Sequence, residues 1–321
     1  MHTDRADSPV SSEIPRKGRT MKPSSHVSII ISDLETHTSL MRLLHSISRQ
    51  STGLEDMEII VVGNGGHSPS DPSLWQTVTG IDAIHLEVMD TSVTSSDAQN
   101  AAAQKANGDK LMFLRPDYRL DPKYITTALA VFDDHPETDI MYSDYIRLAP
   151  ADKTGRPGTV QLPSFREGLL QARGFLGPAV LLTRKAWKDT QGFRKNTAYR
   201  DWDLWVQAAL AGNNFYHVNY PLASCAHRKI SFRERAEDGR CKAMIVINNQ
   251  GFFHEHTVRW ALSYLRGEAW AEAYGFMTIP GPIDVTRMMH DHAVKTMGVD
   301  IMTEKAVRQF DRAVANTKAA L

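Results

Sequence analysis

Residues 58–66, EIIVVGNGG, form a β-branched run that stops at a glycine-rich segment. An earlier run of the same kind, VSIII at residues 27–31, precedes a segment in which apolar residues recur at helical spacing from Leu40 to Ile47. Continuous runs of this kind are typical of strands that are buried on both faces of a parallel sheet. Residues 27–66 therefore predict a strand–helix–strand unit.

The same alternation continues along the chain. The Ala-rich segment 97–107 indicates a helix, and KLMFL at residues 110–114 indicates another core strand. Strands that alternate with helices predict an α/β fold with a mainly parallel sheet, whose ligands bind beyond the carboxyl ends of the strands. We therefore expect the loops at 32–35, 63–66 and 115–118 to border one cleft.

Further elements follow the third core strand. A helical stretch runs from Pro122 to about residue 135, and strands are indicated at 139–144 and 179–182. A helix is expected from residue 200 until Gly212, since glycine commonly ends helices.

The chain divides into three parts. Residues 1–25 carry few large apolar side chains, and this composition predicts a flexible tail. Residues 26–230 carry the α/β pattern, and from residue 231 to 321 helix formers dominate. The sequence thus predicts an α/β domain with a helical C-terminal extension.

The composition is that of a globular protein. A chain of 321 residues with 42% hydrophobic content can bury a sizeable core. Its 37 Lys and Arg balance 37 Asp and Glu, so net charge gives no argument for nucleic acid or an anionic membrane as the main partner. Cys225 and Cys241 are too far apart for a C-x-x-C motif, and no apolar run approaches the length of about 18 residues needed for a transmembrane segment. Together with the polar N-terminus, these features predict a soluble, reduced, cytoplasmic protein.

Seven stretches of residues 26–231 are informative in combination: VSIII (27–31), EIIVVGNGG (58–66), DAQNAAAQKANGDKLMFL (97–114), MYSDY (141–145), QGFR (191–194), RDWDLWVQAALAG (200–212) and HRKIS (227–231). In order and spacing, these stretches resemble family 2 glycosyltransferases. The resemblance implies a GT-A fold, a nucleotide-sugar donor that is usually uridine- or guanosine-linked, and inverting transfer to an acceptor hydroxyl. Such a displacement needs a carboxylate base on the acceptor and positive charge at the departing diphosphate.

The family's Asp-x-Asp metal motif is degenerate in this chain, which has Arg115-Pro116-Asp117 at the corresponding place. The resemblance implies that Asp117 binds the donor and can hold Mg²⁺ or Mn²⁺, with an affinity that the neighbouring guanidinium weakens. Arg115 can instead supply the positive charge itself, because a guanidinium matches phosphate oxygens bidentately. The alternative is that Arg115 is a solvated loop residue or pairs with Asp117.

Two candidate residues for the nucleoside follow the first strands. The family usually has an acidic residue that accepts from the donor base where this chain has Gly63. Asn64 can hydrogen-bond a base or ribose, although a turn role in Asn-Gly-Gly explains it as well. Asp33 can contact the nucleoside, or it can cap the helix that follows.

The family's Glu-Asp segment corresponds to RDWD at residues 200–203, with the Glu replaced and the Asp kept. The resemblance assigns Asp201 as the catalytic base, whereas Asp at a helix start is also favoured by capping and by the helix dipole. Trp202 and Trp205 can stack on an acceptor sugar. As aromatic residues three apart on a helix, they can equally belong to the core.

His227 corresponds to a histidine that in this fold coordinates the metal or touches the diphosphate. It begins the basic run HRK at 227–229, with Arg233 and Arg235 beyond, so phosphate attraction is one interpretation. A solvated basic face is the other.

Three functions stay open at this point. An active glycosyltransferase is the first, and it uses Arg115, His227 and Asp117 around the diphosphate. A noncatalytic GT-A module that binds a nucleotide, a glycan or a protein partner is the second, because positions 63, 115 and 200 depart from the family pattern. A transferase that acts on modified nucleic-acid bases is the third, and the basic run 227–242 is its support.

Overall fold

The structure is a computed structural model. The predicted tail 1–25 lies outside the residues that it describes, and so do Asp33 and His227. The described residues are 27–32, 37–53, 57–64, 75–76, 79–80, 84–89, 93–149, 157–226 and 231–297.

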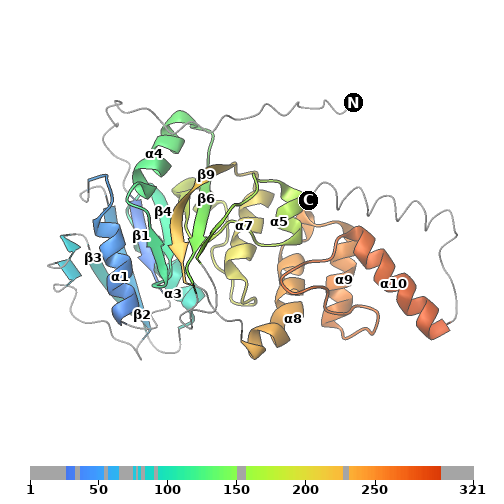
Figure 1. The fold of residues 1–321 in the computed structure, drawn as a ribbon. Coiled ribbons are helices and arrows are strands. Elements are labelled where there is room, and N and C mark those ends of the chain that lie inside the picture. The colour runs from blue at the N-terminus through green and yellow to red at the C-terminus, as the bar shows by residue number, and fades with distance from the viewer. Residues whose placement is uncertain are drawn as a thin grey trace.

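A nine-stranded sheet forms the centre of the described residues, in the order β3-β2-β1-β4-β8-β6-β9-β5, with β7 paired to β6 (Figure 1). Strands β1, β2, β3, β4, β6 and β9 run in one direction, and β5, β7 and β8 run in the other. The predicted α/β fold with a mainly parallel sheet is therefore confirmed. The strands are β1 (Val27–Ile31), β2 (Met57–Asn64), β3 (Ile84–Met89), β4 (Lys110–Leu114), β5 (Tyr118–Leu120), β6 (Ile140–Arg147), β7 (Gly158–Val160), β8 (Val180–Thr183) and β9 (Phe215–Cys225).

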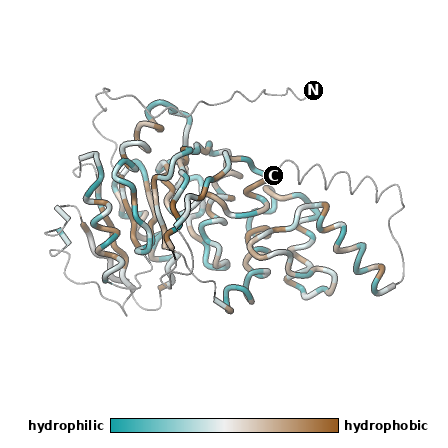
Figure 2. Tube along the Cα trace, in the orientation of Figure 1, coloured by the Kyte–Doolittle hydropathy of each residue, from teal (hydrophilic) through white to brown (hydrophobic). Residues whose placement is uncertain are grey.

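Strand β1 shows why an unbroken apolar run lies at the centre of this sheet. Successive side chains of a strand point to opposite faces. Ile30 packs in the cluster that contains Ala102 of helix α3 (Ser95–Lys105), whereas Ile29 packs in the cluster that contains Leu44 of helix α1 (His37–Ser48). Because helices cover both faces, every position of the strand requires an apolar or well-paired residue. Figure 2 shows the resulting hydrophobic stretches along the strands.

Helices account for the regular structure after β9 within residues 231–297, and the predicted helical C-terminal extension is present there. In Figure 1 these helices lie on the far side of the sheet from α1. Helix α8 begins with a capping box in which Ser231 and Glu234 satisfy each other's backbone N–H groups. The remaining helices are α4 (Tyr124–Asp134), α5 (Glu167–Ala172), α6 (Arg184–Lys188), α7 (Arg200–Leu210), α8 (Phe232–Asn248), η2 (Gln250–Phe252), α9 (Glu255–Leu265) and α10 (Pro282–Met297).

Two further features concern membrane-spanning segments and cysteines. Over the ranges that the structure describes, no helix combines the length and the apolar composition needed to span a bilayer. Cys225 and Cys241 are both free thiols, and Cys241 is buried.

Candidate active site

A pocket opens at the carboxyl end of β4, where the α/β topology predicts ligand binding. It encloses about 430 Å³ of space that is partly open to solvent. Its walls come from the end of β4, from α3, from the segment before β8, from Phe193 and from the first turns of α7. Arg115 and Asp201, the two residues predicted to have opposite roles, both line it.

Arg115 and Asp117 form an ion pair at the pocket. Nε of Arg115 lies 3.1 Å from Oδ1 of Asp117, and the two side chains are 25% and 20% exposed. The Cζ atom of Arg115 also lies 6.0 Å from the ring centroid of Tyr118. A guanidinium carries five N–H donors, so the ion pair at Nε is compatible with further contacts of the same group. The sequence left open whether Arg115 pairs with Asp117 or faces a ligand. In the structure, Arg115 both pairs with Asp117 and lines the pocket.

Tyr118 connects the two charged ends of the pocket. Burial raises the pKa of Tyr118 well above its usual value, the charge of Asp201 raises it further, and Arg115 acts in the opposite direction. The phenol is therefore neutral at physiological pH. Because Asp201 and Arg115 act on the same ring, both charges lie within electrostatic reach of it.

Asp201 lies in the first turn of α7. The N-cap residue of this helix is Tyr199, whose side chain makes no capping hydrogen bond, so Asp201 is two positions inside the helix. Its side chain is exposed and lines the pocket. An exposed carboxylate at a pocket wall can accept a proton from a bound hydroxyl.

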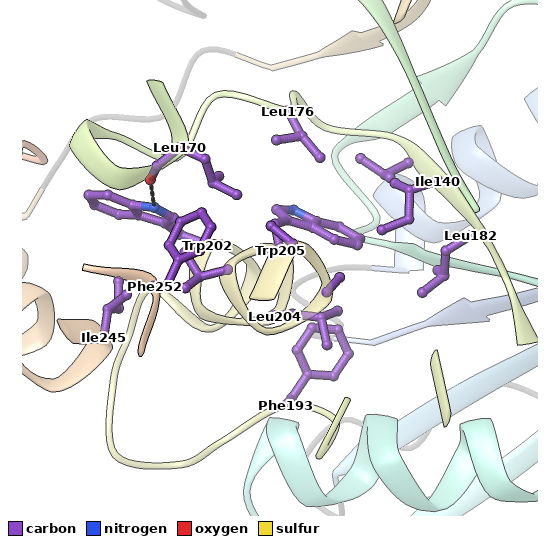
Figure 3. Packing of buried hydrophobic residues seen from close by; sticks show 14 of the residues in the cluster. Ile140, Leu170, Leu176, Leu182, Phe193, Trp202, Leu204, Trp205, Ile245 and Phe252 are labelled. Atoms are coloured by element: carbon purple, nitrogen blue, oxygen red, sulfur yellow. Dashed lines mark hydrogen bonds between the residues drawn. The ribbon is translucent and has the colours of Figure 1, made fainter. Parts of the chain in front are cut away.

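The two candidate tryptophans have different surroundings (Figure 3). Trp202 is 4% exposed, and its Nε1 donates a 2.7 Å hydrogen bond to the carbonyl oxygen of Leu170. It packs beside Phe252 of η2, which corresponds to the core role that the sequence left open. Trp205 is 7% exposed and belongs to the same buried cluster, but it also lines the pocket.

Gln99 is a pocket residue that the sequence analysis did not single out. It is 3% exposed, and its Nε2 donates a 2.7 Å hydrogen bond to Oγ of Ser32, directly after β1. Its Oε1 has no hydrogen-bond partner among the described residues. A buried polar atom without a partner is costly, so a ligand group that donates to Oε1 would be favoured. The available signal was its place on the helix before β4.

The neighbouring Asn100 fixes Phe193 in the pocket wall. Its Nδ2 donates to the carbonyl oxygen of Phe193, and its Oδ1 accepts from the N–H of Phe193, both at 2.9 Å. Gly192 has φ of +70°, and a Cβ there would lie 2.7 Å from Oδ1 of Asn100. Glycine is therefore required where the chain turns against Asn100.

A buried polar network holds α7 in place. Asp203 is fully buried, and its Oδ1 lies 3.2 Å from Nη1 of Arg194 and accepts a 2.8 Å hydrogen bond from Nδ2 of Asn249. Burial raises the pKa of Asp203, and Arg194 opposes this shift. Since Asn249 follows α8, the network ties the helix that carries Asp201 to the C-terminal region.

The acidic residues described at this site do not fit a divalent cation. Asp117 offers one carboxylate, and Oδ1 of that carboxylate is paired with Arg115. Within the described ranges, no group of three His, Cys, Asp or Glu side chains is arranged to hold a metal ion. Mg²⁺ and Mn²⁺ require several oxygen ligands, so this donor set is poor.

Asn64 is the last residue of β2, next to Gly63, and β2 pairs in parallel with β1. Its backbone therefore lies at the same edge of the sheet as the pocket. Asp33 and His227 are the two predicted site residues that the description leaves out.

Solved structures share this fold. The chain is similar to residues 1–349 of TarS from S. aureus, with a TM-score of 0.53 and 17% identity over 77% of this chain and 72% of that chain. A structure of the same TarS segment in complex with UDP-GlcNAc has the same TM-score and identity and is covered over 73%. The mannosyltransferase PcManGT from Pyrobaculum calidifontis, in complex with GDP-Man and Mn²⁺, has a TM-score of 0.51 and 14% identity over 91% of this chain and 80% of that chain. No protein-family profile and no curated protein matches the sequence.

Likeness at such low identity establishes the fold alone. The chain therefore has a GT-A-like glycosyltransferase fold, and the pocket lies at the carboxyl edge of its parallel strands.

Proposed function

We propose that this chain is an inverting glycosyltransferase that moves a sugar from a nucleotide-sugar donor to an acceptor hydroxyl. The supporting observation is that Arg115, after β4, and Asp201, in α7, line one pocket. A single displacement needs positive charge where the diphosphate departs and a carboxylate where the hydroxyl attacks. The fold shared with structures that hold UDP-GlcNAc and GDP-Man supports a donor of this class.

The donor end of the proposed site is built around Arg115. Its guanidinium would bind oxygens of the diphosphate and stabilise the charge that develops as the bond to the sugar breaks. The unpaired Oε1 of Gln99 would accept a hydrogen bond from an N–H or O–H group of the nucleotide sugar. Asp33 and Asn64 are proposed to contact the nucleoside, and His227 the diphosphate.

The acceptor end is built around Asp201. Its carboxylate would remove the proton of the acceptor hydroxyl as the oxygen attacks the anomeric carbon from the side opposite to the diphosphate. Trp205, which lines the pocket, would contact a sugar ring. Trp202 would support that wall from within the core.

Arg115 is proposed to reduce the need for a metal ion. The carboxylate of Asp117 is engaged by the guanidinium, which itself supplies charge at the diphosphate. Any cation bound by Asp117 and His227 would therefore contribute little. Donor affinity is expected to change less than about threefold when Mn²⁺ is replaced by EDTA, because a lost metal–phosphate contact would cost far more.

Calorimetric titration with UDP, GDP, UDP-GlcNAc and GDP-Man, each with Mn²⁺ or EDTA, tests the proposal. At least one ligand should bind. Arg115→Ala should lower the affinity for that ligand about thirtyfold, because a charge-assisted contact is worth roughly 2 kcal/mol. Arg49→Ala is the matched control. Arg49 is exposed directly after α1, and α1 runs back from the carboxyl end of β1, so this arginine lies away from the pocket. Absence of binding by the whole panel would refute the proposal.

A noncatalytic nucleotide-binding module is the second candidate. Arg115 and Arg200 stand where the resembling family has acidic residues, and both line the pocket. A protein of this kind would bind the nucleotide through Arg115 without using Asp201. Turnover by the wild type that Asp201→Asn abolishes would exclude it.

A further inference from the structure

A second arginine, Arg200, lines the pocket beside the proposed base. It is half-buried and directly precedes Asp201 in the first turn of α7. Its Cζ atom lies 5.9 Å from the ring centroid of Phe193, which also lines the pocket. A cation over an aromatic ring is stabilised there. The guanidinium therefore has a defined place in the pocket wall.

The aromatic support below Arg200 is itself rigid. The ring of Phe193 meets that of Phe113 in β4 edge-on, with centroids 4.8 Å apart. The backbone of Phe193 is held by both groups of the Asn100 side-chain amide. A guanidinium on such a platform loses less conformational entropy when it binds a ligand than a freely rotating one.

Arg200 is not required as the counter-charge of the buried carboxylate in its own helix. Asp203 takes Arg194, Asn249 and Gln207 as its partners. The five N–H donors of a guanidinium also allow a contact within the protein together with a ligand contact.

The geometry of a single displacement gives Arg200 its place in the reaction. The attacking hydroxyl and the departing diphosphate lie on opposite sides of the anomeric carbon. Asp201 marks the side of the hydroxyl, and Arg115 marks the side of the diphosphate. Arg200 and Asp201 both line the pocket from the first turn of α7, so Arg200 belongs to the acceptor end of the proposed site.

We propose that Arg200 binds a carboxylate or phosphate group of the acceptor, so that the molecule that carries the attacking hydroxyl is an anion. This inference rests on the proposed function, because Asp201 defines the acceptor side. Guanidinium binds both anions through paired N–H···O contacts, which would hold the acceptor with its hydroxyl at Asp201. Arg200 is then the residue that selects charged over neutral acceptors.

Titration of the UDP-saturated protein with inorganic phosphate and with glucuronate tests this inference, since UDP already fills the diphosphate end. The wild type should bind both anions and should not bind glucose at the same concentrations. Arg200→Ala should lower the affinity for both anions at least about tenfold. Arg200→Lys should recover part of this loss, since Lys keeps the positive charge but lacks the paired N–H donors of the guanidinium. Arg49→Ala should bind as the wild type does.

Equal anion affinity in the wild type and Arg200→Ala, or no anion binding by the UDP complex, would overturn the inference. Comparison of UDP-glucuronate with UDP-glucose distinguishes the source of the anion. A loss in Arg200→Ala that is confined to UDP-glucuronate would place the anion on the donor sugar and overturn the acceptor assignment. Failure of the wild type to bind any nucleotide ligand would instead refute the proposed function itself, and the inference with it.

Discussion

The hydroxyl of Tyr199 donates a 2.6 Å hydrogen bond to Oδ1 of Asp238. Tyr199 directly precedes Arg200 and Asp201, and Asp238 lies in α8, so this bond joins the start of the candidate catalytic helix to the C-terminal region. The same Oδ1 accepts from the N–H of Met277. Oδ2 lies 2.6 Å from Nζ of the fully buried Lys242.

Removal of the Asp238 carboxylate should therefore be strongly destabilising. Burial lowers the pKa of Lys242, and Asp238 counteracts this shift. Asp238→Ala leaves the buried Lys242 ammonium group without its carboxylate partner, although the carbonyl oxygens of Tyr274 and Gly275 still accept from it. Loss of one member of a buried ion pair typically costs about 3–5 kcal/mol. Urea unfolding of Asp238→Ala, Lys242→Met and the double variant measures this. The double variant should be more stable than Asp238→Ala alone, and strictly additive losses would show that the two charges are not coupled.

Gly239, the next residue of α8, has no room for a side chain. A Cβ there would lie 2.2 Å from the hydroxyl oxygen of Tyr264 and 2.4 Å from its Cζ, so the ring of Tyr264 must move. Gly239→Ala should cost about 1–3 kcal/mol despite the higher helix propensity of Ala. Adding Tyr264→Leu should recover part of the loss in thermal unfolding. A Gly239→Ala protein as stable as the wild type would show that α8 and α9 are less tightly packed than described.

Glu58 should make the stability of the sheet depend on pH. Burial alone would raise the pKa of Glu58, but hydrogen bonds from Ser28, Asn107 and Gly108 together lower it from 4.5. A carboxyl group with a lowered pKa in the folded state stabilises the fold above its unfolded pKa, and this contribution is lost as the pH falls through the folded value. Glu58→Gln should therefore be about 1–3 kcal/mol less stable than the wild type at pH 7. Denaturation between pH 3 and 7 should show this difference narrowing below about pH 4.5, the unfolded value, whereas a constant difference would contradict a charged Glu58.

The sequence alone predicted those strands in which most residues are apolar or β-branched and so favour a buried strand. The runs at 27–31, 58–62 and 110–114 are strands because both faces of the sheet are covered. Strand β9 was not predicted, since its sequence FYHVNYPLASC contains Pro221 and has no continuous apolar run. Pro221 pairs with Asp144 at an irregularity in the β6–β9 register, where a missing N–H is tolerated.

The candidate site was only partly predictable, because some of its residues depend on contacts between distant parts of the chain. Arg115 and Asp201 were predicted from motif positions, and both line the pocket. Gln99 carries no local signal, because its importance depends on the buried contact with Ser32 across the sheet. Trp202 and Trp205 look alike in sequence, and only their packing distinguishes a core residue from a wall residue.

The role of Asp201 as base is tested most directly by Asp201→Asn, measured with the nucleotide sugar that binds most tightly in the donor panel. The amide keeps the shape of the side chain but cannot accept the proton. Donor affinity by calorimetry should stay within about twofold of the wild type, and release of the nucleoside diphosphate should fall at least about a hundredfold. Release of the nucleoside diphosphate by Asp201→Asn at the wild-type rate would contradict this account. A variant that loses both donor binding and folding stability would contradict it as well.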